Sequence, residues 1–368
     1  MSQSSFPSGR ATAQVNGAAL CRNYRLLLDR ARRHRPSARL IAVVKDNAYG
    51  HGIPVAVPLL RDAGCDFFAV ATADEALSVK ALCPTAEVLV LGYTPPHTAP
   101  VLAAARITQT VFSPAYGAAL DEALAASGLS LSVHIKIDGG MHRGGLSPRD
   151  GEGLGFCLSR PRLLPTGIYT HFPSADTQRG ATLRALKEFC AVVRELRGAG
   201  YRLFAHAAAS AAALTLPCAV LDGIRTGLAL YGLSPVETDL PLSPVLSLHA
   251  PIVCLTQVPR GTAVGYGGAF VTNRESLLGT LPIGYGDGLF RGLSALPVTL
   301  THQKRDFTLP IAGRICMDHT VLDLTNTPAA IGDCVRLWQD ARLPAALLHT
   351  IPYEILTAIA PRVARRLV

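Results

Sequence analysis

The stretch Leu40-Ile-Ala-Val-Val-Lys-Asp-Asn-Ala-Tyr-Gly-His-Gly52 joins a short apolar run to a single lysine and a polar, glycine-containing turn. Seven similar apolar runs follow in the first two thirds of the chain, and segments of helical character separate them. All eight runs together are 40–44, 67–70, 88–91, 109–112, 131–137, 166–170, 203–205 and 220–224. Eight buried strands alternating with helices predict an α/β fold, a closed (β/α)8 TIM barrel. A doubly wound sheet is the alternative, but no G-x-G-x-x-G follows the first run.

The character of the sequence changes near residue 235, where a proline- and leucine-rich linker begins. Strand-like runs separated by turn residues follow, at 246–255, 277–282, 298–301, 307–311, 320–324 and 334–338. Helical periodicity is missing there until about the last twenty positions. We therefore predict two domains, the barrel over residues 1–236 and a mostly β C-terminal domain over residues 237–368.

The composition excludes several classes of protein. Hydrophobic residues make up 49% of the 368 positions and charged residues 17%, which excludes a largely disordered chain. The first ten residues hold no apolar core of a secretory signal, and no apolar run is long enough to span a membrane. The nine cysteines include no C-x-x-C pair, which argues against a disulfide framework or a metal site and favours the cytoplasm. The net charge of +9 could suggest nucleic acid, but we interpret the densest basic cluster, residues 30–35, as a solvated helix end.

Polar residues follow the ends of the predicted barrel strands, where side chains of a (β/α)8 barrel face the active site. They are Lys45, Lys136, Asp138, Arg143, His171, His206, Ser210 and Arg225. Only five of the 35 basic residues are lysines, and two of those five lie at strand ends. A lysine pressed against a buried strand loses solvation, which favours the neutral amine that attacks an aldehyde.

The segment Ala42–Gly52 closely resembles the pyridoxal-phosphate attachment motif of alanine racemases, and the likeness extends from about residue 13 to 365. Six further segments resemble that family's blocks in the same order, namely 133–143, 167–172, 225–232, 265–267, 282–288 and 313–318. The resemblance implies a pyridoxal 5'-phosphate-dependent isomerase that interconverts L- and D-alanine and supplies D-alanine for peptidoglycan. It also implies a head-to-tail homodimer with shared active sites.

The resemblance implies a role for each matching residue. Lys45 would hold the cofactor as an aldimine and act as the base on one face of the substrate Cα. Tyr266 of the partner subunit would act on the other face, assisted by His171 and Arg225. Arg225 would also face the pyridine nitrogen, and because a guanidinium keeps its proton, racemisation is favoured over transamination.

The same resemblance implies how the cofactor and substrate are bound. The residues that would hold the phosphate are Tyr49, Ser210 and the backbone N–H groups of Gly227 and Leu228. Arg143 and the backbone N–H of Met317 of the partner subunit would meet the substrate carboxylate. Lys136 matches a lysine that is carbamylated in many family members, where it orients the arginine.

Two positions depart from the family's pattern. Pro361 stands where the C-terminal block usually has a tyrosine, and Ala209 stands where an asparagine commonly precedes the serine. The proline leaves more room at the substrate entrance, so a serine-preferring or broad-specificity racemase stays open. Serine/alanine racemases share the Met-His-Arg variant found at 141–143. A non-catalytic cofactor-binding protein is less favoured because such proteins normally lack the β domain, and a related decarboxylase needs a cysteine and aspartate arrangement that is not found.

Overall fold

The computed structural model describes residues 10–368, which divide into two compact units. The barrel unit comprises Ala18–Ala48 and Ala56–Ser243, and the C-terminal unit comprises the residues up to Gly17, Tyr49–Val55 and Pro244–Val368. The barrel thus extends past residue 236, and two early segments join the C-terminal unit. The first nine residues, on which the expectation of no secretory signal rests, lie outside the described residues.

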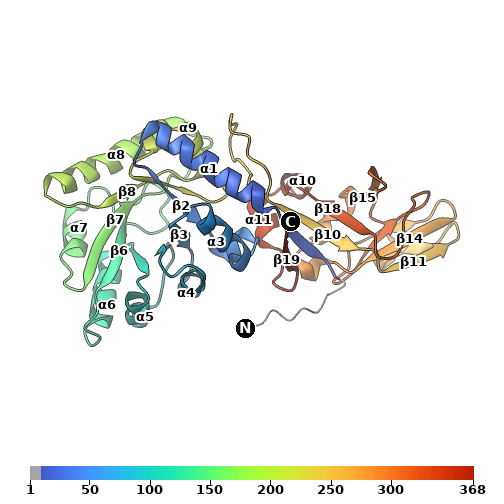
Figure 1. Cartoon of the computed structure of the whole chain (residues 1–368), viewed down its shortest axis with the longest axis horizontal. Coiled ribbons are helices and arrows are strands. Elements are labelled where there is room, and N and C mark those ends of the chain that lie inside the picture. The colour runs from blue at the N-terminus through green and yellow to red at the C-terminus, as the bar shows by residue number, and fades with distance from the viewer. Residues whose placement is uncertain (1–9) are drawn as a thin grey trace. The chain divides into compact units, whose positions relative to one another are not determined.

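The barrel unit is a closed sheet of eight parallel strands, which confirms the predicted (β/α)8 fold (Figure 1). The strands are β2 (Arg39–Val43), β3 (Phe67–Val70), β4 (Glu87–Val90), β5 (Thr108–Val111), β6 (Leu131–Lys136), β7 (Leu163–Tyr169), β8 (Phe204–His206) and β9 (Gly223–Thr226). Pairing of β2 with β9 closes the sheet. Each predicted apolar run overlaps one strand, because strands covered on both faces need apolar side chains at nearly every position.

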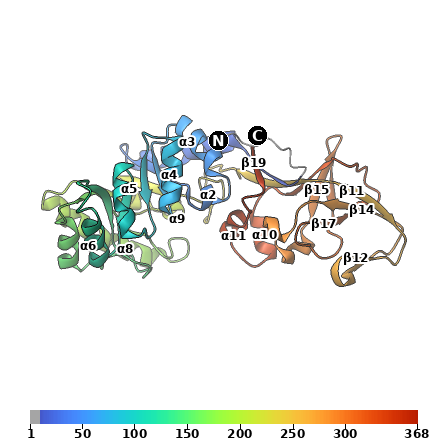
Figure 2. The same cartoon turned by 90° about the horizontal axis from the view of Figure 1, so that it is seen from below.

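Helices surround these strands in both views (Figure 1, Figure 2). They are α1 (Gly17–His34), α3 (Ile53–Asp62), α4 (Ala73–Leu82), α5 (Ala99–Ala104), α6 (Pro114–Ala123), α7 (Gly151–Leu158), α8 (Arg179–Gly198) and α9 (Ser210–Thr215). The exposed Arg32, Arg33 and His34 form the last turn of α1, which confirms the helix-end interpretation of the basic cluster. Within residues 10–368, no helix has the length and apolar character that crossing a bilayer requires.

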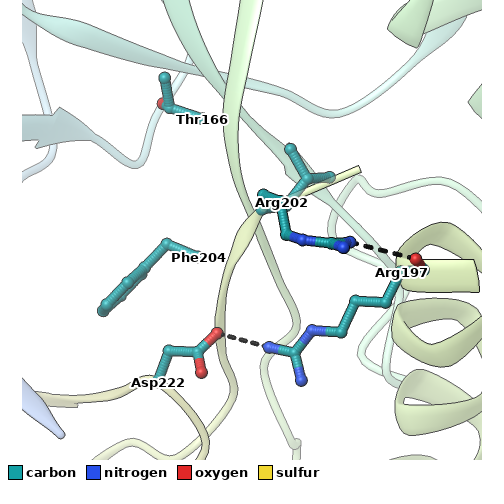
Figure 3. Close-up of a pocket in the computed structure, with 6 residues that line it drawn as sticks. Thr166, Arg197, Arg202, Phe204 and Asp222 are labelled. Atoms are coloured by element: carbon teal, nitrogen blue, oxygen red, sulfur yellow. Dashed lines mark hydrogen bonds and ion pairs between the residues drawn. The ribbon is translucent and has the colours of Figure 1, made fainter. Parts of the chain in front are cut away.

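Asp222 forms ion pairs and a hydrogen bond with three other residues at the amino-terminal end of the barrel. Its carboxylate pairs with Arg35 at 2.6 Å and Arg197 at 2.8 Å, and it accepts the N–H of Ala205 at 2.8 Å. An open cavity of about 650 Å³ lies beside these groups, with Arg202 donating to the carbonyl of Arg197 (Figure 3). Since this is the end of β8 and β9 opposite the strand-end residues named above, we attribute the cluster to stability.

The C-terminal unit is mostly β, as predicted. One sheet has the order β16-β15-β18-β10-β1-β19, and a smaller sheet has the order β11-β14-β17. The predicted strands are β10 (Leu246–Pro251), β11 (Cys254–Val258), β14 (Ser276–Leu281), β15 (Val298–His302), β16 (Arg305–Leu309), β17 (Thr320–Asp323) and β18 (Cys334–Trp338). The predicted run 246–255 is therefore two strands, and α10 (Arg342–Leu347) and α11 (Pro352–Thr357) follow the last of the group.

Two strands of the larger sheet were not predicted, β1 (Thr12–Val15) and β19 (Ala364–Leu367). β1 pairs antiparallel with β10 and parallel with β19. These pairings explain why the residues before Gly17 belong to the C-terminal unit although they precede the barrel in the sequence.

Candidate active site

Lys45 follows β2 at the carboxyl-terminal end of the barrel and opens the short element α2 (Lys45–Tyr49). Residues 46–49 all have φ between 51° and 55°, in the left-handed region. That region costs an L residue about 1–2 kcal/mol. The N–H of Ala48 donates to the carbonyl of Val44 at 2.8 Å and closes the turn. Backbone strain of this kind gathers at functional sites, here directly behind the lysine.

The side chain of Glu75 supports this strained turn. One carboxylate oxygen accepts the N–H of Asn47 at 3.1 Å, and the other accepts the N–H of Ala71 at 2.9 Å. Glu75→Ala removes both acceptors, so we expect amide exchange of Asn47 to accelerate by about tenfold, as loss of one hydrogen bond implies. Hydrogen exchange of peptides covering residues 44–50 measures this.

Asp74→Ala is the matched control for that variant. Asp74 is an exposed residue in the same first turn of α4. Its substitution by alanine removes one negative charge from the helix N-terminus, as Glu75→Ala does, but leaves the hydrogen bond to Asn47 in place. Equal exchange rates in the two variants would show that Glu75 does not hold the turn.

Lys136 and Arg143 lie at the two ends of the loop after β6. The Lys136 Nζ donates to the backbone carbonyl of Arg143 at 2.8 Å, and the Arg143 side chain is exposed. Asp138 organises the loop, because one carboxylate oxygen accepts the N–H groups of residues 140–142 at 3.1 Å each. Gly145 has φ of 129°, and a Cβ there would lie 2.7 Å from the Asp138 nitrogen. The loop is thus closely folded around Asp138.

Arg225, on β9, is buried inside the barrel with 4% of its surface exposed. Its guanidinium donates to the carbonyl of Thr170 at 2.7 Å and to Nδ1 of His206 at 2.7 Å, and it lies over the ring of Tyr169. Burial lowers the pKa of Arg225 to about 10, so the group keeps its proton near neutral pH. Among residues 10–368 it has no carboxylate partner. A buried cation of this kind suits an anionic or electron-rich ligand.

His171 lies just beyond β7, and several of the predicted basic residues lie close enough to it to affect its pKa. Burial lowers the pKa of His171 to about 3, and positive charges contribute to the lowering in the order Arg225, Arg143, Lys136 and Lys45. Four basic residues predicted from strand ends therefore lie near one imidazole. The carboxyl-terminal end of the barrel is strongly electropositive and suits an anionic ligand.

Two buried histidines and the half-buried His171 predict how stability depends on pH. Burial is the main cause that lowers the pKa of His134 and His171 to about 3 and that of His206 well below 6.5. Between pH 6.5 and about 3 the unfolded chain therefore binds more protons, so the free energy of unfolding falls as the pH falls. Each histidine contributes about 1.4 kcal/mol per pH unit. We expect urea midpoints to fall steeply below pH 6.5.

Substitution should separate the contribution of these histidines to the pH dependence of unfolding from the contribution of the carboxylates. His171→Gln removes one of the three and should flatten the slope of unfolding free energy against pH, whereas His34→Gln, in the exposed last turn of α1, should not. Identical slopes in the two variants would contradict the assignment to buried histidines.

The loop after β9 supplies hydroxyl and N–H groups that fit a phosphate. Ser210 begins α9, and its hydroxyl accepts the N–H of Gly227 at 3.4 Å and of Ala229 at 3.2 Å, on either side of Leu228. The hydroxyl of Thr226 is fully buried and has no hydrogen-bond partner among residues 10–368. Because a buried polar atom without a partner is costly, this hydroxyl points to a polar ligand. The residues present thus fit a phosphorylated cofactor.

Ala209 precedes Ser210 at the N-cap of α9 and offers no side-chain cap. Alanine in place of a capping asparagine costs a helix roughly 1 kcal/mol.

Three predicted site residues lie in the C-terminal unit. Tyr266 is the first residue of the 3-10 helix Tyr266–Gly268, and its neighbours Gly265 and Gly267 both have positive φ angles, which turn the chain sharply. The Tyr266 residue is 72% exposed. Met317 is 56% exposed, and its carbonyl accepts the N–H of Gly286 at 2.9 Å. Tyr49 packs within the same unit, with its ring 5.9 Å from that of Tyr353. Tyr266 and Met317 are thus both exposed on the C-terminal unit.

The strand-end pattern missed His134, which lies inside the barrel on β6. Its Nδ1 is 2.8 Å from Nε2 of His206. His134 stands two residues before Lys136, so alternation along the strand places both on the same face. That alternation is the signal that could have found it.

Comparison with known proteins identifies the family. A family model described as alanine racemase, N-terminal domain, matches residues 15–235, and one described as alanine racemase, C-terminal domain, matches residues 245–367. The chain is 40% identical to the alanine racemase of Desulfovibrio desulfuricans over 349 residues, 90% of this chain and 91% of that protein. It is 34% identical to the serine/alanine racemase of Enterococcus gallinarum over 373 residues, 98% of this chain but 52% of that protein.

The fold agrees with solved structures as well. The alanine racemase from Streptomyces coelicolor has a TM-score of 0.88 and 34% identity, with 98% of each chain covered. The chain therefore belongs to the alanine racemase family, a family of isomerases.

Proposed function

We propose that this protein is a pyridoxal 5'-phosphate-dependent racemase that interconverts L- and D-alanine. The gathering of Lys45, Lys136, Arg143 and Arg225 near His171 carries the proposal. A lysine available for covalent attachment stands there among cations that match a phosphate and a carboxylate. When bound, the cofactor withdraws electrons from the substrate and makes its Cα proton acidic.

Lys45 would hold the cofactor covalently. The hydroxyls of Tyr49 and Ser210 and the N–H groups of Gly227 and Leu228 would hold its phosphate. The unpartnered Thr226 hydroxyl next to this loop supports a polar ligand there. Arg225 would face the ring nitrogen, and with a pKa of about 10 it would donate a hydrogen bond while keeping its own proton.

Racemisation requires that a proton leave one face of Cα and return to the other, so two groups must flank the carbon. Lys45 would move the proton on one face, and Tyr266 of the partner subunit on the other. A tyrosine needs neighbouring positive charge to give up its proton near neutral pH. Arg225 would supply this positive charge, and His171 would hydrogen-bond with the Tyr266 hydroxyl.

Arg143 and the backbone N–H of Met317 of the partner subunit would bind the substrate carboxylate. Burial, followed by the charge of Arg143, lowers the pKa of Lys136. The neutral amine so favoured can add carbon dioxide and release a proton, giving a carbamate that would orient Arg143. Intact mass with and without carbon dioxide tests this modification, and an unchanged mass would contradict it.

We further propose a head-to-tail homodimer, supported by the exposure of Tyr266 and Met317. Family membership supports a role in supplying D-alanine for peptidoglycan in the cytoplasm.

A serine-preferring or broad-specificity racemase is the second candidate. The proline at position 361 is exposed, and the Enterococcus gallinarum relative is named a serine/alanine racemase. A proline is smaller than the usual tyrosine, so a substrate with an added hydroxyl would find more room.

A racemisation assay with L-alanine, L-serine and L-arginine tests both candidates. Purified protein with added pyridoxal 5'-phosphate should form D-alanine fastest, as measured by chiral chromatography. Equal or faster formation of D-serine would favour the second candidate, and no turnover of any of the three would contradict both.

A further inference from the structure

Three buried side chains form a hydrogen-bonded line inside the barrel. The Arg225 guanidinium lies 2.7 Å from Nδ1 of His206, and Nε2 of His206 lies 2.8 Å from Nδ1 of His134. Their exposed fractions are 4%, 0% and 3% respectively, so water does not compete for these contacts. β9, β8 and β6 each contribute one member.

The chemistry of the donors fixes the direction of every bond in this line. A guanidinium can only donate, so Nδ1 of His206 must accept. A neutral imidazole then carries its proton on Nε2, which donates to Nδ1 of His134. His134 in turn carries its proton on Nε2. Burial and the charge of Arg225 keep both rings neutral near pH 7.

Packing holds His134 in place at the end of the line. The ring of Phe67 meets it edge-on, with centroids 6.0 Å apart. Gly167 on β7 leaves room for it, because a Cβ there would lie 2.4 Å from the His134 Nε2. His134 is therefore a fixed acceptor that faces the Nε2 of His206.

We propose that His134 is a positioning residue that holds the ring of His206 and thereby the guanidinium of Arg225. Because Arg225 fixes the proton of His206 on Nε2, loss of the acceptor leaves this buried N–H unpaired, and the ring gains by turning until the N–H finds another partner. Arg225 would then lose its bond to the imidazole and keep only its backbone carbonyl partners. The consequence for catalysis rests on the proposed function, whereas the tautomer does not.

The tautomer can be measured directly. In protein labelled with ¹⁵N-histidine, the nitrogen shifts of His206, assigned by loss of its signals in His206→Gln, should show a bare Nδ1 and a protonated Nε2. His134→Asn keeps an acceptor oxygen close to the position of Nδ1 and should preserve this pattern. His134→Leu removes the acceptor and should move the Nδ1 resonance of His206 toward that of an imidazole nitrogen that accepts no hydrogen bond, because the turned ring loses Arg225.

A protonated Nδ1 in the unsubstituted protein, or an unchanged Nδ1 resonance in His134→Leu, would overturn the inference. The first measurement needs no variant to fold. In the racemisation assay, kcat/KM should fall by roughly tenfold or more in His134→Leu and be largely retained in His134→Asn. Equal losses in both variants with an unchanged Nδ1 resonance would indicate a packing role instead.

The two proposals can fail separately. Absence of racemisation in the unsubstituted protein, together with the expected tautomers, would reject the proposed function and leave the role of His134 toward Arg225 intact. Racemisation together with the opposite tautomer would reject the role of His134 alone.

Discussion

Lys45→Ala is expected to abolish covalent attachment of the cofactor and to lower kcat for alanine by at least about 1,000-fold, because Lys45 is proposed to serve as both anchor and base. The measurement is the visible absorbance of the lysine–cofactor linkage, followed by the racemisation rate. Lys45 stands directly after β2, so alanine there leaves the barrel strand and its pairing intact.

Lys187→Ala is the matched control. Lys187 is an exposed residue of α8, and the same substitution there should preserve both the absorbance and the rate. A Lys45→Ala protein that kept the lysine–cofactor absorbance would show that another lysine holds the cofactor.

Tyr266→Phe is expected to lower kcat by about 100- to 10,000-fold while the cofactor absorbance is kept, since the hydroxyl that is proposed to move a proton is lost. The ring is 72% exposed, so the loss of its hydroxyl should leave stability unchanged. Tyr201→Phe, at a tyrosine 38% exposed, is the control and should retain full activity.

Mixing these two inactive variants tests whether the site is shared between subunits. A mixed dimer of Lys45→Ala and Tyr266→Phe chains has one site with neither residue and one site with both. Random exchange of subunits should therefore restore about a quarter of the native sites. No recovery after subunits have demonstrably exchanged would mean that Lys45 and Tyr266 act from the same chain.

The barrel could be predicted from the sequence because its strands are buried on both faces and read as apolar runs. The missed strands lack that signal. β1 is Thr-Ala-Gln-Val, and β19 carries Arg365 and Arg366, so nothing local marks them as strands. Their identity comes from the pairing of β1 with β10 on one side and with β19 on the other, across more than 200 residues of sequence.

The site could be predicted in part. Strand-end positions marked Lys45, Lys136, His171 and Arg225 as candidates, and in the structure the charges of the other three act on His171. The bond between His134 and His206 depends on closure of the barrel, which brings together side chains 72 residues apart. The left-handed turn at 46–49 was also unpredictable, because alanine and tyrosine rarely adopt that conformation without tertiary support.

Racemisation of L-alanine in deuterium oxide, stopped at low conversion, tests two-base catalysis by Lys45 and Tyr266 of the partner subunit most directly. If one group removes the proton and another, equilibrated with solvent, returns it on the opposite face, the D-alanine formed carries deuterium at Cα. We predict deuterium in nearly all of the product, while unreacted L-alanine keeps its hydrogen. D-alanine that retains the original hydrogen would show that a single group carries the proton between faces and would contradict the assignment.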